Sequence, residues 1–143
     1  MNNLMINGRD SLATWGIRMG DGFINIIDDF PTMKPFIENE SRNENGKRIV
    51  TKDAKVSSRQ INIPFTMEGS NETDFRQKRD LFISELKRGM IEITVPSLSD
   101  EKYRLVYLGK GTSYALSRDR SFAKFILKFE EPNPANRKNK PSL

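Results

Sequence analysis

Apolar residues recur along this chain with two different periods, and the clearest example of the shorter period lies in residues 58–68. Every second residue there is apolar, which is typical of a strand with one buried and one solvated face. The apolar members are Ile61, Ile63, Phe65 and Met67. Pro64 falls inside this strand and has no amide hydrogen for a ladder bond, so we expect the strand to lie at a sheet edge or to carry a bulge.

A longer period marks residues 72–88 as a helix. Asn71 can cap the first turn, acidic residues follow it, and Gly89 stands just past the last turn. The apolar positions that form one face are Phe75, Leu81, Phe82, Ile83 and Leu86. We expect this face to pack on a sheet, and we interpret the opposite face, which carries charges of both signs, as solvent-exposed rather than as a nucleic-acid surface.

Shorter apolar runs on both sides of the helix predict the remaining strands. Asn7-Gly8 is a hairpin-turn signal, and Pro96 ends a later run. The predicted strands lie at about 4–10, 12–19, 23–27, 58–68, 90–95, 103–108 and 122–129, with a short strand at 113–116. Because they do not alternate with helices, the predicted fold class is mainly β: a β-sandwich or a partly closed antiparallel barrel with one α-helix packed against it.

The segment from about residue 31 to 55 follows neither period. Prolines, asparagines and a glycine interrupt it, and charged residues replace apolar ones. A polar loop of this length is usually functional or disordered, and it has room for a short strand near residues 47–51. One hypothesis is that an arm at residues 34–55 orders against a neighbouring subunit; the alternative is a solvated, flexible loop.

These features predict one domain, residues 1–132, followed by a basic tail, residues 133–143, that we expect to be flexible. A strand edge can be completed by another subunit, and an arm can order against one. Trp15 has two interpretations, as part of the core or as the anchor of an interface. The candidate subunit-interface residues are Trp15, Lys34, Phe36, Arg48, Ile49 and Pro64.

Composition narrows the chemistry that the chain can perform, because its 143 residues include neither cysteine nor histidine. Thiol nucleophiles, zinc–thiolate sites and every Ser-His or Cys-His dyad are thereby excluded. The acid pairs Asp28-Asp29 and Glu130-Glu131 each lie where a strand meets a proline, and we interpret them as solvated strand ends. Gly109-Lys110-Gly111-Thr112 lacks the spacing of a phosphate-binding loop, so it favours a β-turn. We expect no enzymatic activity, no cofactor and no metal site.

The net charge of +5 permits an acidic partner, but the basic residues are dispersed except at 137–140. Six aromatic residues could stack on bases: Phe65, Tyr103, Tyr107, Phe122, Phe125 and Phe129. A small β-barrel that binds single-stranded nucleic acid is therefore the alternative function. Phe65, Phe125 and Phe129 share faces with aliphatic residues, however, and this favours a position in the core.

Targeting signals are not evident in the sequence. Residues 1–8 are too few and too polar for a signal peptide. No apolar run approaches the ~20 residues that a membrane-spanning helix needs. We therefore expect no membrane association, and we expect synthesis and assembly in a cytoplasm.

The order of these elements resembles that of the distal tail proteins of long-tailed phages and the wider tail-tube group. The matching features are an opening strand with a tight turn at Ile6-Asn7-Gly8, a second segment with Trp15-Gly16-Ile17, a polar loop, an alternating strand and then a helix. A Gly-led strand, a Tyr-Arg strand from Tyr103 and a Phe-rich strand that ends in Glu130-Glu131-Pro132 follow. The resemblance covers nearly the whole chain through order, spacing and short motifs.

The resemblance implies a structural role in a virion tail. It implies a β-sandwich with a helix that assembles into a homo-oligomeric ring, a hexamer, between the tail tube and the baseplate, with other tail or baseplate proteins as partners. The chain is shorter than distal tail proteins that carry an added carbohydrate-binding-like domain. It would therefore correspond to the ring-forming domain alone or to a related tube or terminator subunit.

Overall fold

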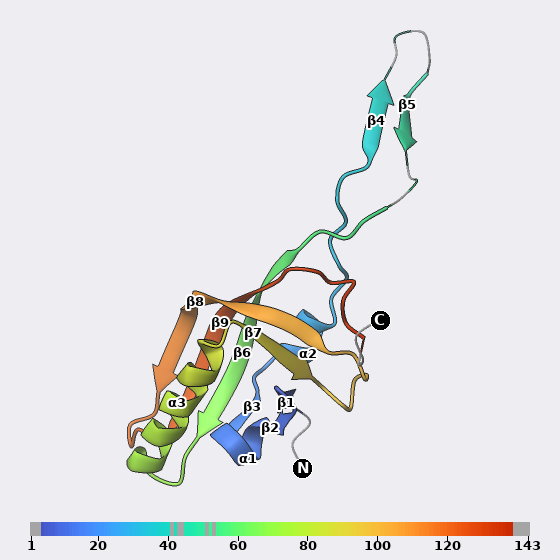
Figure 1. Ribbon diagram of the computed structural model, residues 1–143. Coiled ribbons are helices and arrows are strands. Elements are labelled where there is room, and N and C mark those ends of the chain that lie inside the picture. Colours follow the sequence, from blue (N-terminus) through green and yellow to red (C-terminus); the bar gives the residue numbers. More distant parts are fainter. Residues whose placement is uncertain (1–3, 41, 43–44, 51, 53, 139–143) are drawn as a thin grey trace.

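The computed structural model describes residues 4–40, 42, 45–50, 52 and 54–138 (Figure 1). Its helices are α1 (Ser11–Trp15), α2 (Phe23–Ile27) and α3 (Glu72–Leu86). Its strands are β1 (Met5–Ile6), β2 (Arg9–Asp10), β3 (Ile17–Met19), β4 (Ile37–Glu40), β5 (Lys47–Val50), β6 (Arg59–Glu68), β7 (Met90–Thr94), β8 (Tyr103–Leu116) and β9 (Phe122–Glu131). The mainly β fold class is confirmed.

Most strands belong to one seven-stranded sheet in the order β2-β1-β7-β8-β9-β6-β3. Each neighbouring pair is antiparallel, and the sheet does not close on itself. The longest ladder joins β6 to β9 without a register shift, from Arg59 opposite Glu131 to Glu68 opposite Phe122. Strands β4 and β5 form a separate two-stranded ribbon that projects from this body (Figure 1).

The strand that contains Pro64 is not an edge strand, contrary to the sequence-based expectation. β6 lies between β9 and β3, and its register carries no bulge. The last pair with β3 joins Met19 to Phe65, and the Pro64 carbonyl accepts a hydrogen bond from Gly20 N at 3.0 Å. The carbonyl of Pro64 thus faces β3 and not β9. The missing N–H falls where strand pairing ends, so no ladder bond is lost.

The predicted strand at residues 12–19 is instead the short helix α1 followed by β3. Asp10 is the N-cap, and its side chain accepts hydrogen bonds from Leu12 N at 2.9 Å and Ala13 N at 3.2 Å. Gly16 ends the helix with φ 67°, and its carbonyl accepts from Glu68 N at 2.9 Å. A capping carboxylate and a left-handed glycine therefore outweigh the apparent alternation.

The predicted strand at residues 23–27 is likewise a helix, α2. Phe23 and Ile27 are buried, whereas Ile24 is 37% exposed. This is the i, i+4 spacing of one helix face, and Gly22 with φ 80° turns the chain into it. The β-branched composition that indicated a strand is a weak preference, which tertiary packing overrides here.

The long helix α3 begins where the sequence indicates and ends slightly earlier. Asn71 caps it by accepting from Asp74 N at 2.8 Å, and the helix stops at Leu86 rather than Arg88. Phe75, Phe82 and Leu86 are buried, as expected. Leu81 is 58% exposed, so its assignment to the packed face is wrong.

Aromatic residues form the centre of the core, where the helices meet one face of the sheet. The ring of Phe65 lies 5.7 Å from that of Phe23, 6.1 Å from Phe82, 5.8 Å from Phe125 and 6.3 Å from Phe129. Each contact falls within the range in which aromatic pairs add stability beyond burial. This cluster joins α2, α3, β6 and β9 into one unit.

β8 is a single long strand where the sequence predicts two segments with a turn between them. It pairs with β7 over Tyr103–Val106 and with β9 over Val106–Leu116. Its register shifts between Tyr107 and Gly111 and again before Ser113, and Gly109 has φ 82°. The predicted turn is therefore a bulged bend, which redirects the second half of the strand (Figure 1).

Candidate assembly interface

The segment expected to be a long loop is an arm built as an antiparallel ribbon. β4 and β5 pair from Ile37 opposite Val50 to Glu40 opposite Lys47. Nearer the body, Met33 bridges Val56, and Lys34 N donates to Lys55 O at 2.9 Å. At the foot, Ser57 N donates to Thr32 O at 2.7 Å. The eight steps from Thr32 to Glu40 correspond to roughly 26 Å of extended chain. Figure 1 shows that this ribbon projects from the body.

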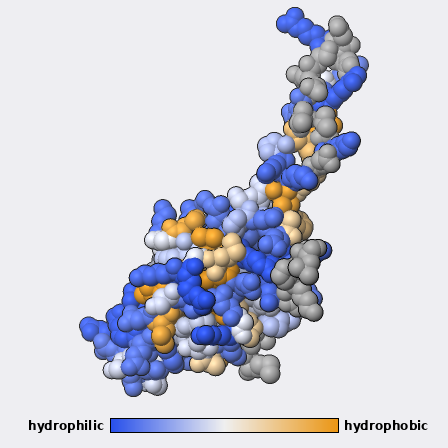
Figure 2. Space-filling model, in the orientation of Figure 1, coloured by the Kyte–Doolittle hydropathy of each residue, from blue (hydrophilic) through white to orange (hydrophobic). Residues whose placement is uncertain are grey.

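The arm exposes apolar side chains instead of burying them. Phe36 is 39% exposed, Ile49 is 47% exposed, and Met33 and Phe30 at its foot are 42% and 89% exposed. Figure 2 shows apolar residues along the lower part of the arm, separated from those of the body by hydrophilic surface. Exposed apolar side chains on a projecting ribbon are typical of a protein–protein contact.

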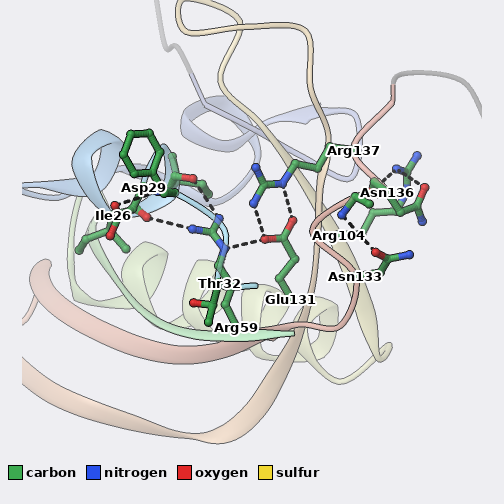
Figure 3. A network of polar contacts seen from close by, with 12 residues as sticks. Ile26, Asp29, Thr32, Arg59, Arg104, Glu131, Asn133, Asn136 and Arg137 are labelled. Carbon is green, nitrogen blue, oxygen red and sulfur yellow. Dashed lines mark hydrogen bonds and ion pairs between the residues drawn. The ribbon is translucent and has the colours of Figure 1, made fainter. Parts of the chain in front are cut away.

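An ion network that the sequence did not reveal holds the foot of the arm to the sheet (Figure 3). The carboxylate of Glu131 accepts from Arg59 Nε at 2.6 Å and from Arg137 Nε and Nη2 at 2.8 and 2.7 Å. Arg59 also donates from Nη2 to Ile27 O at 2.9 Å and from Nη1 to Ile26 O at 3.4 Å. One guanidinium thereby ties the end of α2, which leads into the arm, to the start of β6, which leads out of it.

Glu131 is completely buried, in contrast to the solvated strand end that the sequence suggested. Burial alone would raise the pKa of this carboxyl, but hydrogen bonds from Arg137 and Arg59 and the charges of both arginines lower it below its usual value. The group is therefore ionised in the folded protein. The companion pair Asp28 and Asp29 is exposed, as expected.

The start of the tail predicted to be flexible is in contact with the sheet. The Arg137 guanidinium lies over the Tyr103 ring at 4.8 Å, and the carbonyl of Arg137 accepts from Lys102 N at 2.9 Å. Arg104 donates to the carbonyls of Asn136 and Lys138 at 3.0 and 3.2 Å. Residues 133–138 thus follow the sheet, and residues 139–143 lie outside the described part of the chain.

The candidate interface residues fall into two groups. Lys34, Phe36, Arg48 and Ile49 all lie exposed on the arm. Trp15 is 2% exposed, and its ring lies 5.9 Å from that of Phe82, so of its two interpretations the structure supports the core. Pro64 lies within the sheet. The expected strand near 47–51 is β5, with Thr51 outside the described residues.

The aromatic residues proposed as a base-stacking platform do not form one. Phe65, Tyr103, Phe125 and Phe129 are at most 8% exposed. Phe122 and Tyr107 are half-buried, and the Tyr107 ring lies 5.7 Å from that of Phe129. Stacking needs open aromatic faces beside a basic groove, and these faces are covered by the protein's own side chains.

Within the described ranges, no group of three or more aspartate or glutamate side chains is arranged to hold a metal ion. No helix in those ranges is long and apolar enough to cross a membrane. Every buried side-chain polar atom that the structure describes has a hydrogen-bond partner, so no orphaned group points to an absent ligand.

No protein-family model and no curated protein sequence matches the chain. Among solved structures, the fold is similar to the crystal structure of the SPP1 Dit (gp 19.1) protein, described as a paradigm of the hub adsorption apparatus in phages that infect Gram-positive bacteria. The TM-score is 0.57 at 17% sequence identity, over 92% of this chain and 50% of that one. The chain therefore spans about half the length of that protein and shares its fold.

Proposed function

We propose that this protein is a structural subunit of a phage or phage-derived tail and that it assembles into a ring, a hexamer, through its arm. The observation that carries the proposal is a paired ribbon that leaves Phe36 and Ile49 exposed beyond a well-packed body. The fold shared with the SPP1 Dit protein, a part of a phage adsorption apparatus, supports a role in a tail. The same likeness supports other tail or baseplate proteins as further partners and the virion tail as the location.

The physical argument concerns the stability of the arm. An isolated two-stranded ribbon is at best marginally stable in water, because it has no second layer to bury its apolar side chains. Each Å² of apolar surface that a partner covers contributes about 25 cal/mol. Phe36, Ile49, Met33 and Phe30 supply such surface on one projecting element. A neighbouring copy that covers them would stabilise both the arm and the ring.

The test is the solution mass of the protein by light scattering on a sizing column, followed by negative-stain imaging. We expect a species of about six copies with a central opening. A matched variant lacks residues 34–55 and joins Met33 to Val56 by an Asn-Gly turn, because these residues already face each other across the ribbon. We expect it to fold as the parent does and to be a monomer.

Two results would count against the proposal. If the shortened variant forms the same ring as the parent, the arm is not the assembly contact. If the parent stays monomeric at all concentrations and also after mixing with tail components, the ring itself is wrong. Circular dichroism of both chains separates loss of assembly from loss of folding.

A further inference from the structure

The second half of β8 is an unpaired sheet edge within the body. β7 pairs with β8 only as far as Val106, whereas β9 pairs with it to Leu116. From Gly109 to Leu116, therefore, no strand of the described chain lies on the outer side of β8. All residues from Leu108 to Ala115 are exposed. Long exposed edges of this kind are templates for a further strand, and native proteins usually cover or blunt them.

The backbone groups that point outward from this edge can be identified from the pairing. Ser117 N donates to Phe122 O at 2.8 Å, so that opposite pair is hydrogen-bonded. Bonded and non-bonded pairs alternate along an antiparallel ladder. Leu116 opposite Ala123 and Tyr114 opposite Phe125 are then the non-bonded pairs. Their N–H and C=O groups point away from β9, towards the place of an added strand.

A groove lies beside this edge, between β8 and α3. Its volume is about 700 Å³, and its lining is mainly apolar. Phe82 and Leu86 from α3, Tyr114 from β8 and Leu127 from β9 contribute to it. Tyr114 is 52% exposed although its ring lies 6.3 Å from that of Phe125. An added strand would direct every second side chain into this groove.

The charges at the groove are of one sign. Its two charged lining residues are Arg79 and Lys87, and no aspartate or glutamate lines it. Arg79 has a loose ion pair with Asp80 at 3.7 Å, and Asp80 is highly exposed. Lys110 adds a further positive charge on the exposed bend. The complementary ligand therefore carries carboxylates.

We propose that the β8 edge and the groove beside it bind an extended segment of another protein whose groove-facing side chains, every second residue, include both apolar residues and aspartate or glutamate. The segment pairs with Tyr114 and Leu116 as an additional antiparallel or parallel strand. Its apolar side chains enter the groove, and its carboxylates meet Arg79 and Lys87. This site is distinct from the arm and does not depend on ring formation.

The probe is a fluorescein-labelled ten-residue peptide in which every second residue is threonine and the positions between them alternate valine and glutamate, so that valine and glutamate share one face. It is titrated with the full chain and followed by anisotropy. Two control peptides carry lysine in place of glutamate or a proline at the centre. We expect saturable binding of the first peptide, at least tenfold weaker binding of the lysine peptide, and no binding of the proline peptide. Added salt should weaken the first interaction.

Two pairs of variants test the two parts of the site. The double change Arg79→Glu with Lys87→Glu should weaken binding at least tenfold, whereas Lys124→Glu with Lys128→Glu, on the opposite sheet face, should leave it unchanged. Tyr114→Ala removes only a side chain, and Tyr114→Pro also removes the outward N–H. We expect the proline variant to bind about tenfold more weakly than the alanine variant. Thermal unfolding of each variant confirms that the body is folded.

The proposal is overturned if the valine–glutamate peptide does not bind saturably at concentrations up to roughly 1 mM. It is also overturned if the charge-reversed pair binds as the parent does. A third contrary result is loss of self-association in Tyr114→Pro without any peptide binding, because the edge would then pair with a second copy of this chain. The arm-deleted variant should bind the peptide normally, so failure of the ring proposal leaves this test intact.

Discussion

The body and the arm use the same local structure, antiparallel strand pairing, with opposite outcomes for their side chains. In the body, Ile63, Phe65 and Met67 of β6 are at most 2% exposed, because the helices α2 and α3 pack against this strand. In the arm, Phe36 and Ile49 remain 39% and 47% exposed, because the ribbon is separate from the seven-stranded sheet. Backbone pairing alone therefore does not bury surface; a second layer does. The body buries its apolar surface, whereas the arm leaves its own exposed, and we propose that a partner covers it.

The two regions meet at Glu131, Arg59 and Arg137. Arg59 donates to the carbonyl groups at the end of α2. Arg137, in the tail, donates to the Glu131 carboxylate. Changes at this junction should weaken the body, and changes on the arm should not.

Glu131→Gln should give the largest loss of stability. Glutamine keeps the shape but removes the charge that balances two arginines in a dry site, so we expect the free energy of unfolding to fall by about 3–5 kcal/mol. Glu130→Gln is the matched control, because Glu130 makes only a 3.4 Å contact with Gln60 on the exposed side. Glu130→Gln should lower the free energy of unfolding by at most about 1 kcal/mol. Urea unfolding measures both; equal losses would show that the network does not stabilise the fold.

A substitution at Gly16 should lower the free energy of unfolding by a smaller amount. It has φ 67°, and a Cβ added there would lie 2.1 Å from Glu68 O, so Gly16→Ala should cost about 2–4 kcal/mol. Gly46 in the arm has φ 71° but open space around it. Gly46→Ala should leave the unfolding midpoint of the body unchanged. A large shift in that midpoint would show that arm and body unfold together.

Acid should weaken the body by titrating Glu131. Because the folded pKa of this carboxyl is lowered, its contribution is present above the ordinary glutamate pKa of about 4.3 and is lost as the pH falls through the lower folded pKa. Unfolding midpoints measured from pH 7 to pH 2 should therefore decrease in acid. In Glu131→Gln the unfolding midpoint should change less with pH. If the midpoint has the same pH dependence in both proteins, other groups cause the loss of stability in acid.

Phe36→Ser combined with Ile49→Ser should have the smallest effect on stability. Both side chains are exposed in the single chain, so we expect the free energy of unfolding to change by less than about 0.5 kcal/mol. Self-association measured by light scattering should nevertheless weaken, because these residues supply the apolar surface of the proposed contact. A stable variant that assembles normally would remove them from the interface.

The sequence predicted much of this fold and, in retrospect, held a signal for the junction. The alternation that places Phe125, Leu127 and Phe129 on the inner face of β9 continues to Glu131, and the alternation of β6 runs back to Arg59. An acid and a base on inward-facing positions of two strands indicate a buried pair. Turn and proline signals directed attention to solvated strand ends instead. The pairing of Arg59 with Glu131 depends on register, which one sequence does not reveal.

The sequence by itself determined β6, the start of α3 and the Asn-Gly turn, because alternation and capping act within a few residues. Its composition excluded thiol and imidazole chemistry. Only the tertiary structure decided that residues 23–27 are helical, that β6 is flanked on both sides, and that the polar segment becomes an extended arm. Those outcomes depend on which surfaces meet across the fold. Burial against distant residues outweighs local preferences of a few tenths of a kcal/mol per residue.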